Sequence, residues 1–333
     1  MGFTDNHDGS SVADATEGAV LARIFPRLPA SDAAIVGPGD DSAVMSAPDT
    51  RYVVTTDMMV HGPDFRWAWS TPWQLGWKAA ATNLSDVAAM GARPTGLVVA
   101  LAVPESTPVT VLEEFSDGLR EACVSLAPEC GVVGGDLSVS ATFTIAITAF
   151  GDLEERQPVL RSGARPGDVV AVSGRLGMAS LGLDLLFSRG VDANGVPDAS
   201  RARSVGEQHP ELVGAQLTPQ PPIGDGPLAA VAGATAMMDI SDGLALDASR
   251  MARASHVTLA FESLLLGDDV DAALRGSEDH GLLACFPAGV ELPGGFERIG
   301  MVSERGTDDV TCDGDALIVK GWDPYTEWDG AAG

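Results

Sequence analysis

The chain has 333 residues, more than one ordinary core supports and about right for two domains. Hydrophobic residues make up 45% and charged residues 20%, a balance that excludes a disordered or fibrous protein. The 47 acidic and 20 basic side chains give a formal net charge of -27, which repels nucleic acid and anionic lipid, so we expect neither as a partner.

The first half alternates between predicted helices and strands. Residues 1–15 are polar and acidic and are predicted to be a disordered tail before a short helix near residues 20–25. Thr71 as N-cap, Pro72 at the first helical position and Gly91 as C-cap predict a helix. A further helix is predicted over 108–127, and strands over 51–57, 95–103, 130–136 and 142–150. This alternation predicts an α/β or α+β domain over residues 16–152.

A second α/β domain is predicted over residues 153–333, after a segment rich in charge, Gly and Pro. The polar stretch from about 191 to 222 receives no predicted element. Helices are predicted over 178–190 and 243–254, and strands over 168–174, 234–240, 296–304 and 315–321.

The basic residues and the cysteines exclude several kinds of site. Only two lysines occur, Lys78 and Lys320, and neither follows a glycine-rich P-loop. The cysteines form no C-x-x-C pair, which excludes a zinc knuckle and suits a reducing compartment. Since no leader or membrane-spanning stretch is recognisable, we expect a cytoplasmic protein without a membrane partner.

Aspartates recur where apolar runs end or turn, and ligands of open sheets gather at the carboxyl ends of strands. Thr55 and Thr56 precede one of them and add hard oxygen donors of the type that Mg²⁺ prefers. Each aspartate alone could be a solvated surface residue. The candidate carboxylates are Asp41, Asp57, Asp86, Asp136, Asp239 and Asp242.

So many carboxylates near ATP would repel it unless several divalent cations lay between them, which predicts magnesium-dependent phosphoryl transfer. Two glycines before Asp136 predict a close approach of the backbone to a phosphate. Ser241 and Asp242 stand where a helix begins, a place that favours an anion arriving with its cations. The histidines show no metal-ligand spacing.

Read in order, the segments GPGDDSAV, VVTTDMMV, NLSDVAAMGA, GGDLS, RSGARPGD and DISDGL resemble the motif series of thiamine-monophosphate kinases. That family lies in the superfamily of aminoimidazole ribonucleotide synthetase. Each segment alone is weak evidence, but six in order over roughly residues 17–325 are specific. The resemblance implies the two-domain fold of that superfamily, with the N-terminal sheets pairing across a homodimer.

The resemblance also implies roles for individual residues. ATP would be the co-substrate and thiamine monophosphate the acceptor, with direct transfer of the γ-phosphoryl group. A phosphate monoester has a second pKa of about 6, so the attacking oxygen is ionised and needs no general base. The implied ATP contacts are Gly135, Asp136, Arg161 and Ser241, and the implied magnesium ligands are Asp41, Thr55, Thr56, Asp57, Asp86, Asp136, Asp239 and Asp242.

The chain departs from the family where the acceptor should bind. Asp64-Phe65 replaces the usual His-Phe, with His61 three residues earlier. GSEDHGL replaces GGEDYEL, which keeps a glutamate but puts Gly281 in place of another, and GWDPY replaces an aromatic-Asp-His-Phe segment, with Pro324 in place of the histidine. The acceptor contacts that the resemblance implies are Asp64, Glu278 and Trp322.

Several alternatives remain. Selenophosphate synthetase needs a reactive Cys near the N-terminus, and no Cys precedes Cys123. A hydrogenase-maturation relative would end in Cys, whereas this chain ends WDGAAG. A superfamily kinase or synthetase with another acceptor stays open, as does a non-catalytic member that binds divalent ions.

Overall fold

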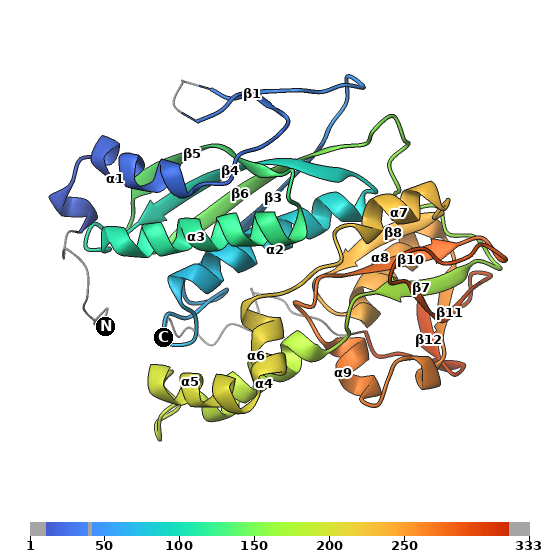
Figure 1. The fold of residues 1–333 in the computed structure, drawn as a ribbon. Coiled ribbons are helices and arrows are strands. Elements are labelled where there is room, and N and C mark those ends of the chain that lie inside the picture. The colour runs from blue at the N-terminus through green and yellow to red at the C-terminus, as the bar shows by residue number, and fades with distance from the viewer. Residues whose placement is uncertain (1–10, 39–41, 320–333) are drawn as a thin grey trace.

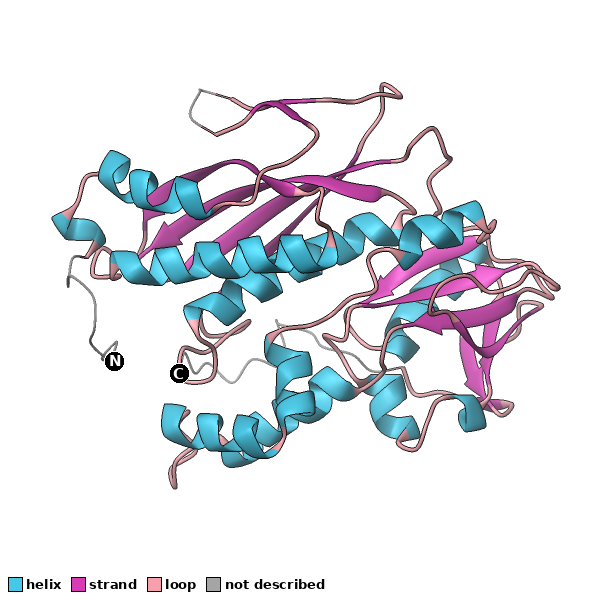
Figure 2. Ribbon diagram, in the orientation of Figure 1, coloured by secondary structure: helices cyan, strands magenta, loops and turns pink. Residues whose placement is uncertain are grey.

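The computed structural model describes residues 11–38 and 42–319, leaving aside the side chain of Glu17. A four-stranded sheet and a seven-stranded sheet lie side by side, each with helices packed against it (Figures 1 and 2). A pair of short strands, β1 (Ala34–Val36) and β2 (Val44–Met45), forms a separate hairpin. The mixed α/β architecture predicted from the sequence is confirmed.

The first sheet has the strand order β3-β6-β4-β5. Strand β6 pairs antiparallel with both of its neighbours, and β4 pairs parallel with β5 through the crossover helix α3 (Val109–Leu126). Its strands are β3 (Val53–Val60), β4 (Arg93–Val103), β5 (Gly131–Val139) and β6 (Thr144–Asp152).

The two faces of this sheet differ. Alternate residues of β6 and β4, such as Ile147 and Leu97, are almost completely buried beneath helices α2 (Pro72–Ala89) and α3 (Figure 1). Val54 and Met58, which point to the opposite face of β3, are 55% and 62% exposed. Helices therefore cover one face, and apolar side chains on the other remain exposed.

Helix α2 lies between the two sheets. It begins at the predicted N-cap, where Thr71 Oγ1 accepts from the Gln74 amide at 3.2 Å, and it has Pro72 in its first turn. Met90 is the C-cap, and Gly91, the predicted C-cap, follows it with φ +73°. Most of the helix is buried, including Lys78, because it contacts both halves of the molecule.

The second sheet has the order β13-β12-β9-β11-β7-β10-β8. Every residue of β8 and β10 is buried, which is expected when helices or connections cover both faces of a strand. Its strands are β7 (Val169–Ser173), β8 (Ala236–Ile240), β9 (Thr258–Phe261), β10 (Gly281–Phe286), β11 (Glu297–Ser303), β12 (Val310–Cys312) and β13 (Asp315–Ala316). Its helices are α7 (Asp225–Val231), α8 (Leu244–Ser255) and α9 (Val270–Arg275).

Some elements differ from the sequence prediction. Residues 191–222, to which no element was assigned, contain α5 (Ala199–Gln208) and α6 (Pro210–Leu217), which pack beside α4 (Met178–Arg189). Helix α5 buries only Ala202 and Val205, so its apolar signal is weak. Strands β9 and β10 were also not predicted. The strand predicted over 315–321 is limited to β13, and residues 320–321 lie outside the described residues.

The N-terminal region is ordered earlier than the predicted tail boundary at residue 15. The amides of Val12 and Ala13 donate to the carbonyls of Thr107 and Glu105, each at 2.9 Å. Backbone pairing, rather than burial of large side chains, fixes this segment, and hydropathy does not detect such pairing. Helix α1 (Glu17–Ile24) follows near the predicted position.

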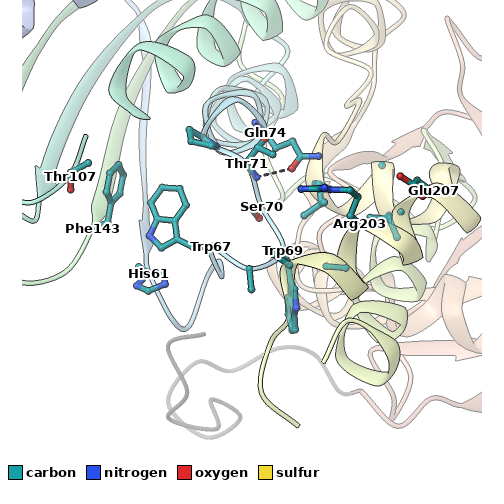
Figure 3. Close-up of a pocket in the computed structure, with 18 of the residues that line it drawn as sticks. His61, Trp67, Trp69, Ser70, Thr71, Gln74, Thr107, Phe143, Arg203 and Glu207 are labelled. Atoms are coloured by element: carbon teal, nitrogen blue, oxygen red, sulfur yellow. Dashed lines mark hydrogen bonds between the residues drawn. The ribbon is translucent and has the colours of Figure 1, made fainter. Parts of the chain in front are cut away.

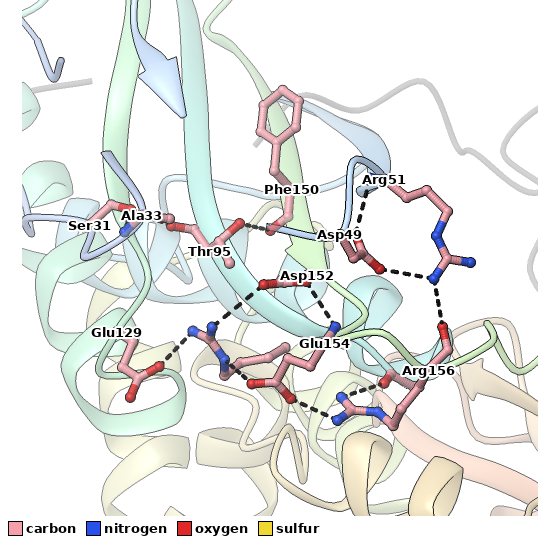
Figure 4. A network of polar contacts seen from close by, with 12 residues as sticks. Ser31, Ala33, Asp49, Arg51, Thr95, Glu129, Phe150, Asp152, Glu154 and Arg156 are labelled. Carbon is pink, nitrogen blue, oxygen red and sulfur yellow. Dashed lines mark hydrogen bonds and ion pairs between the residues drawn. The ribbon is translucent and has the colours of Figure 1, made fainter. Parts of the chain in front are cut away.

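A network of ion pairs joins the ends of the first sheet to the connection that leads to the second (Figure 4). Arg93 at the start of β4 contacts Glu129 at 2.5 Å and Glu154 at 3.0 Å, and Arg156 contacts Glu154 at 2.8 Å. Arg51 donates to the Arg156 carbonyl at 3.2 Å. Each exposed pair contributes little alone, but the shared partners hold the chain where it leaves β6.

Candidate active site

Carboxylates from both sheets meet beside helix α2. Thr55 and Asp57 lie on the helix-covered face of β3, and Thr55 Oγ1 donates to Asp86 Oδ2 of α2 at 2.9 Å. Asp239, near the end of β8, is 4% exposed and comes from the second sheet. We call Asp57, Asp86 and Asp239 the carboxylate cluster.

Electrostatic interactions show that the members of the cluster are neighbours. Burial and the nearby charges of Asp239 and Asp57 raise the pKa of Asp86 to about 7. Burial raises the pKa of Asp57 as well, and Asp239 adds to that effect. Carboxylates that repel one another in a buried place favour a proton or a cation between them.

Among the described residues, His280 is the basic side chain that pairs with Asp239. Its Nδ1 lies 3.6 Å from Asp239 Oδ2, and its amide donates to the Ile240 carbonyl at 2.9 Å. Burial disfavours the charged ring, but Asp239 and Glu278 outweigh it and raise the His280 pKa. This histidine has no motif spacing in the sequence, so its place beside Asp239 was not predicted.

A cavity of about 560 Å³ opens beside the cluster, between the two sheets. Thr55, Asp86 and Asp239 form its polar wall, and Arg161 also lines it. Tyr52, for which no role was predicted, contributes an aromatic ring. The lining of this inter-sheet cavity therefore combines carboxylates, the guanidinium groups of Arg51 and Arg161, and apolar surface. Its apolar lining comes from Val53, Val54, Ala89, Met90, Leu153, Pro158, Met237 and Met238.

The start of α8 holds an internal carboxylate. The amides of Ser241 and Asp242 donate to Asp247 Oδ2 at 3.1 and 3.0 Å. Asp247 is fully buried, and burial together with Asp239 raises its pKa to about 6. Arg250 Nη1 bridges Asp242 Oδ2 at 2.6 Å and Asp247 Oδ1 at 2.7 Å. The anion expected at these two amides is therefore a side chain of the same helix.

Asp136 does not join the cluster within one chain. Met58, Ala146, Ala100 and Asp136 face one another across β3, β6, β4 and β5. With strands about 4.8 Å apart, three steps separate Asp136 from β3 by roughly 14 Å. Asp136 also shares the exposed face with Met58, opposite to the face that carries Asp57.

The glycine before Asp136 has a structural explanation. A Cβ on Gly135 would lie 2.1 Å from the Val99 carbonyl oxygen, so β4 approaches too closely for any side chain. Packing against β4 thus accounts for this glycine, and the approach of Gly135 to a phosphate stays a prediction. Gly134 has open space at the corresponding position.

Two of the predicted acceptor contacts, Asp64 and Glu278, line one smaller cavity of about 100 Å³. Lys78 from α2 is in its wall and forms an ion pair with Glu278. Burial raises the pKa of Asp64, and the charge of Glu278 adds to that effect. We call this space the Lys78 cavity. Its lining therefore contains both acidic and basic groups.

A larger cavity of about 810 Å³ adjoins the Lys78 cavity and shares Trp69, Ser70 and Leu217 with it. Aromatic side chains form one wall, and Arg203 and Glu207 of α5 face them (Figure 3). Trp67 and Phe143 pack edge to face, with ring centroids 5.1 Å apart. His61, which lies three residues before Asp64 in the chain, also lines this aromatic cavity.

Other predicted ligands lie apart or outside the described residues. Thr56 Oγ1 donates to the Ile147 carbonyl at 2.9 Å. Asp41, Trp322 and Pro324 fall outside the described residues. Among the residues that are described, no three His, Cys, Asp or Glu side chains are close enough to form a complete metal site. Mg²⁺ often uses only one or two carboxylates and completes its shell with phosphate and water, so the oxygen donors of the cluster fit it.

Comparison with known proteins identifies the class of protein that has this fold. Residues 39–153 match the family model for AIR synthase related protein, N-terminal domain. The chain is 40% identical to a thiamine-monophosphate kinase of Mycobacterium tuberculosis over 329 residues, covering 94% of this chain and 90% of the relative. The chain therefore belongs to the thiamine-monophosphate kinase family, whose members are enzymes.

Solved structures agree with this assignment. The thiamine-monophosphate kinase of Stenotrophomonas maltophilia matches with a TM-score of 0.71 and 30% identity, over 90% of this chain and 96% of that one. A structure of AaThiL complexed with AMPPCP and TMP matches with a TM-score of 0.70 and 32% identity, over 85% and 90%. In the described part of this chain, every helix is too short or too polar to cross a bilayer.

Proposed function

We propose that this protein phosphorylates thiamine monophosphate with ATP, forming thiamine diphosphate and ADP. The observation that carries the proposal is that Asp86 and Asp239 of the carboxylate cluster line the inter-sheet cavity together with Arg161. The AaThiL complex supports the proposal, because a protein of the same fold binds AMPPCP and TMP. The inter-sheet cavity would take the nucleotide, with Arg161 and Ser241 near its phosphates and Tyr52 beside its apolar part.

Magnesium would be held by the oxygen donors of both sheets. Asp57, Asp86 and Asp239 form the cluster, and Thr55 orients Asp86. Asp242, which is paired with Arg250, would bind Mg²⁺ in place of that side chain. When bound, Mg²⁺ neutralises the phosphate oxygens and the carboxylates together. We retain Asp41, Thr56 and Asp136 as further proposed ligands.

The chain's residues would position the two substrates rather than move protons. Arg161 would orient a phosphate through its planar guanidinium, and the buried surroundings of the cluster would strengthen every charge interaction there. The acceptor phosphate is already largely ionised at neutral pH, so its oxygen can attack the γ-phosphorus in line without a base. The bond to the β-phosphate oxygen breaks, and ADP leaves with that electron pair.

The acceptor's rings would lie in the Lys78 cavity and the adjoining aromatic cavity. Asp64 and Glu278 supply negative charge for a cationic heterocycle, and Trp69 and Phe65 supply aromatic surface. Trp322 is retained as a proposed contact.

We further propose that the enzyme is a homodimer in which a second copy covers the exposed face of the first sheet. Val54 and Met58 expose apolar surface there, and Asp136 lies on the same face. Because Asp136 is roughly 14 Å from β3 in its own chain, it would serve the cluster of the partner subunit. We also propose that the domains divide as residues 16–152 and 153–333, because each sheet packs against its own apolar cluster.

The test is formation of thiamine diphosphate from ATP, magnesium and thiamine monophosphate by the purified protein, followed by chromatography. The Asp86→Asn variant should form none, and the exposed Asp184→Asn variant should match the native enzyme. If the native protein binds ATP but leaves thiamine monophosphate unchanged while it phosphorylates another monophosphate, the acceptor assignment is wrong. If it hydrolyses or transfers nothing, the enzyme proposal is wrong.

A further inference from the structure

Lys78 is a buried cation that the proposed chemistry does not yet use. It lies on α2 and is 6% exposed. A buried ammonium group is costly unless charged and polar partners surround it, so its partners indicate why the chain holds it there. The lysine does not follow a glycine-rich P-loop, which excludes the Walker A way of holding ATP phosphates.

The partners of Lys78 come from two other segments. Glu278, in the loop before β10, forms the ion pair. Gln216 of α6 accepts from Lys78 Nζ at 3.0 Å when its amide is oriented so that its nitrogen donates to the Ala179 carbonyl at 3.2 Å. The ammonium group thus fixes a carboxylate on one side and is itself fixed by an amide on the other.

The backbone at Glu278 is also constrained. Glu278 has φ +69° and His280 has φ +52°, a region that non-glycine residues rarely adopt. The Glu278 amide donates to the Ser241 carbonyl at 2.8 Å, and the His280 carbonyl accepts from Ser85 Oγ at 3.1 Å. Two chain segments therefore hold this loop in a conformation that it would not adopt alone, with the Glu278 side chain in the wall of the Lys78 cavity.

The charge state of Glu278 follows from these contacts. Burial alone would raise its pKa, but Lys78 and then His280 lower it below the ordinary value. An ionised carboxylate accepts hydrogen bonds and attracts cations, and it cannot donate. A ligand with a positive ring or N–H donors suits it, and thiamine monophosphate has both a cationic thiazolium ring and an amino group.

The other cation of this cavity is differently engaged. The Arg66 guanidinium lies 4.8 Å from the ring centroids of both Trp69 and Phe187. Asp64 accepts from the Val60 amide at 2.6 Å. Lys78 is therefore the cation that directly contacts Glu278 among the described residues of the cavity.

We propose that Lys78 is a positioning residue for the acceptor, and that with Gln216 it orients the Glu278 carboxylate that binds the cationic part of thiamine monophosphate. This inference rests on the proposed function, and it adds a residue that acts through Glu278. It implies that Lys78 affects recognition of the acceptor and leaves binding of ATP in the inter-sheet cavity largely unchanged.

A double-mutant cycle on the full-length enzyme tests the proposal. KM for thiamine monophosphate, KM for ATP and kcat are measured for Lys78→Met, Glu278→Gln and the double variant. We expect Lys78→Met to raise the acceptor KM at least about tenfold, as loss of an ordered charged hydrogen bond does, while KM for ATP changes less than about twofold. In the Glu278→Gln background, Lys78→Met should cause no further increase.

Two more variants keep the result interpretable if Lys78→Met folds poorly. Lys78→Arg preserves the charge and should recover part of the acceptor KM, and Gln216→Leu should raise that KM by a few fold. Arg253→Met, which breaks an exposed ion pair with Asp309 on the second sheet, is the matched control and should match the native enzyme.

The outcomes distinguish failure of the Lys78 role from failure of the proposed function. If the native enzyme forms thiamine diphosphate but Lys78→Met raises both KM values equally, or still raises the acceptor KM after Glu278→Gln, the positioning role of Lys78 is wrong and the proposed function stands. If the native enzyme forms no thiamine diphosphate, the proposed function fails and the role of Lys78 in that reaction fails with it.

Discussion

The two sheets of this protein differ in how completely one chain covers them. Strands β8 and β10 of the second sheet are buried at every residue, with apolar clusters on both faces. The first sheet has helices α2 and α3 on one face and leaves Val54 and Met58 exposed on the other. The second sheet is therefore complete within one chain, whereas the first has a face suited to a second copy and carries Asp136 on it.

The largest expected effect comes from Asp86, which links the sheets. Asp86→Asn should lower kcat at least about a thousandfold, because it removes a charge at the centre of a preorganised electrostatic site. The metal-free variant should also be more heat-stable than the native protein, since a carboxylate repelled by Asp239 and Asp57 is gone. Product formation and thermal unfolding in EDTA measure the two effects. Loss of both activity and stability would instead indicate a purely structural Asp86.

Mixing two inactive variants tests whether the active site spans two chains. If Asp136 serves the partner's cluster, a dimer of Asp86→Asn with Asp136→Asn has one intact site and one doubly altered site. After random subunit exchange, about a quarter of native activity per chain should return. If Asp136→Asn is active by itself, or if the mixture of the two inactive variants stays inactive, Asp136 does not serve the partner's cluster, and the comparison of the two sheets loses its functional meaning.

A smaller effect, on dimer affinity, is expected from a charge placed on the exposed face of the first sheet. Met58→Glu should weaken the homodimer by at least tenfold in Kd, because a carboxylate would have to be buried in an apolar interface. Val231→Glu, at a 71% exposed position on α7, is the matched control. Sedimentation velocity over a concentration series measures the dissociation. An unchanged dimer in the Met58 variant would place the interface elsewhere.

Much of this architecture could be predicted from periodicity and punctuation, because strands β3 to β6 alternate with helices and α2 begins at Thr71 and Pro72 and is closed by Gly91. The carboxylates at segment ends were also visible. His280, Lys78 and Asp247 were not, because each acquires its role only from a residue distant in the fold or from a local backbone geometry. Asp247, for example, lies in the middle of an ordinary helical pattern, and only the structure shows it bonded to the amides of Ser241 and Asp242.

The smallest expected effect is the pH dependence of magnesium binding, which distinguishes the carboxylate at the junction of the two sheets from one beside the second sheet. Asp86 titrates near 7 in the folded protein and near 3.9 when unfolded, so between these values the folded state binds more protons. Its contribution to the free energy of unfolding is thus greatest in acid and falls as pH rises toward 7. Mg²⁺ must compete with that proton below pH 7, so magnesium should raise the Tm by about 2–4 °C more at pH 8 than at pH 5.5.

Asp247 sharpens the test, because its pKa is also raised, to about 6, yet its oxygens are occupied by the amides of Ser241 and Asp242 and by Arg250. Asp247 lowers stability with rising pH in the same direction as Asp86, but it lies on α8 beside the second sheet, and we expect no metal ion at its occupied oxygens. Thermal unfolding with EDTA or Mg²⁺ at both pH values, in the native protein and in Asp86→Asn, separates the contributions. In Asp86→Asn, the rise in Tm caused by Mg²⁺ should no longer differ between the two pH values. Part of the fall in Tm with rising pH should persist in EDTA. A difference that survives in Asp86→Asn would show that magnesium binds away from the junction of the two sheets.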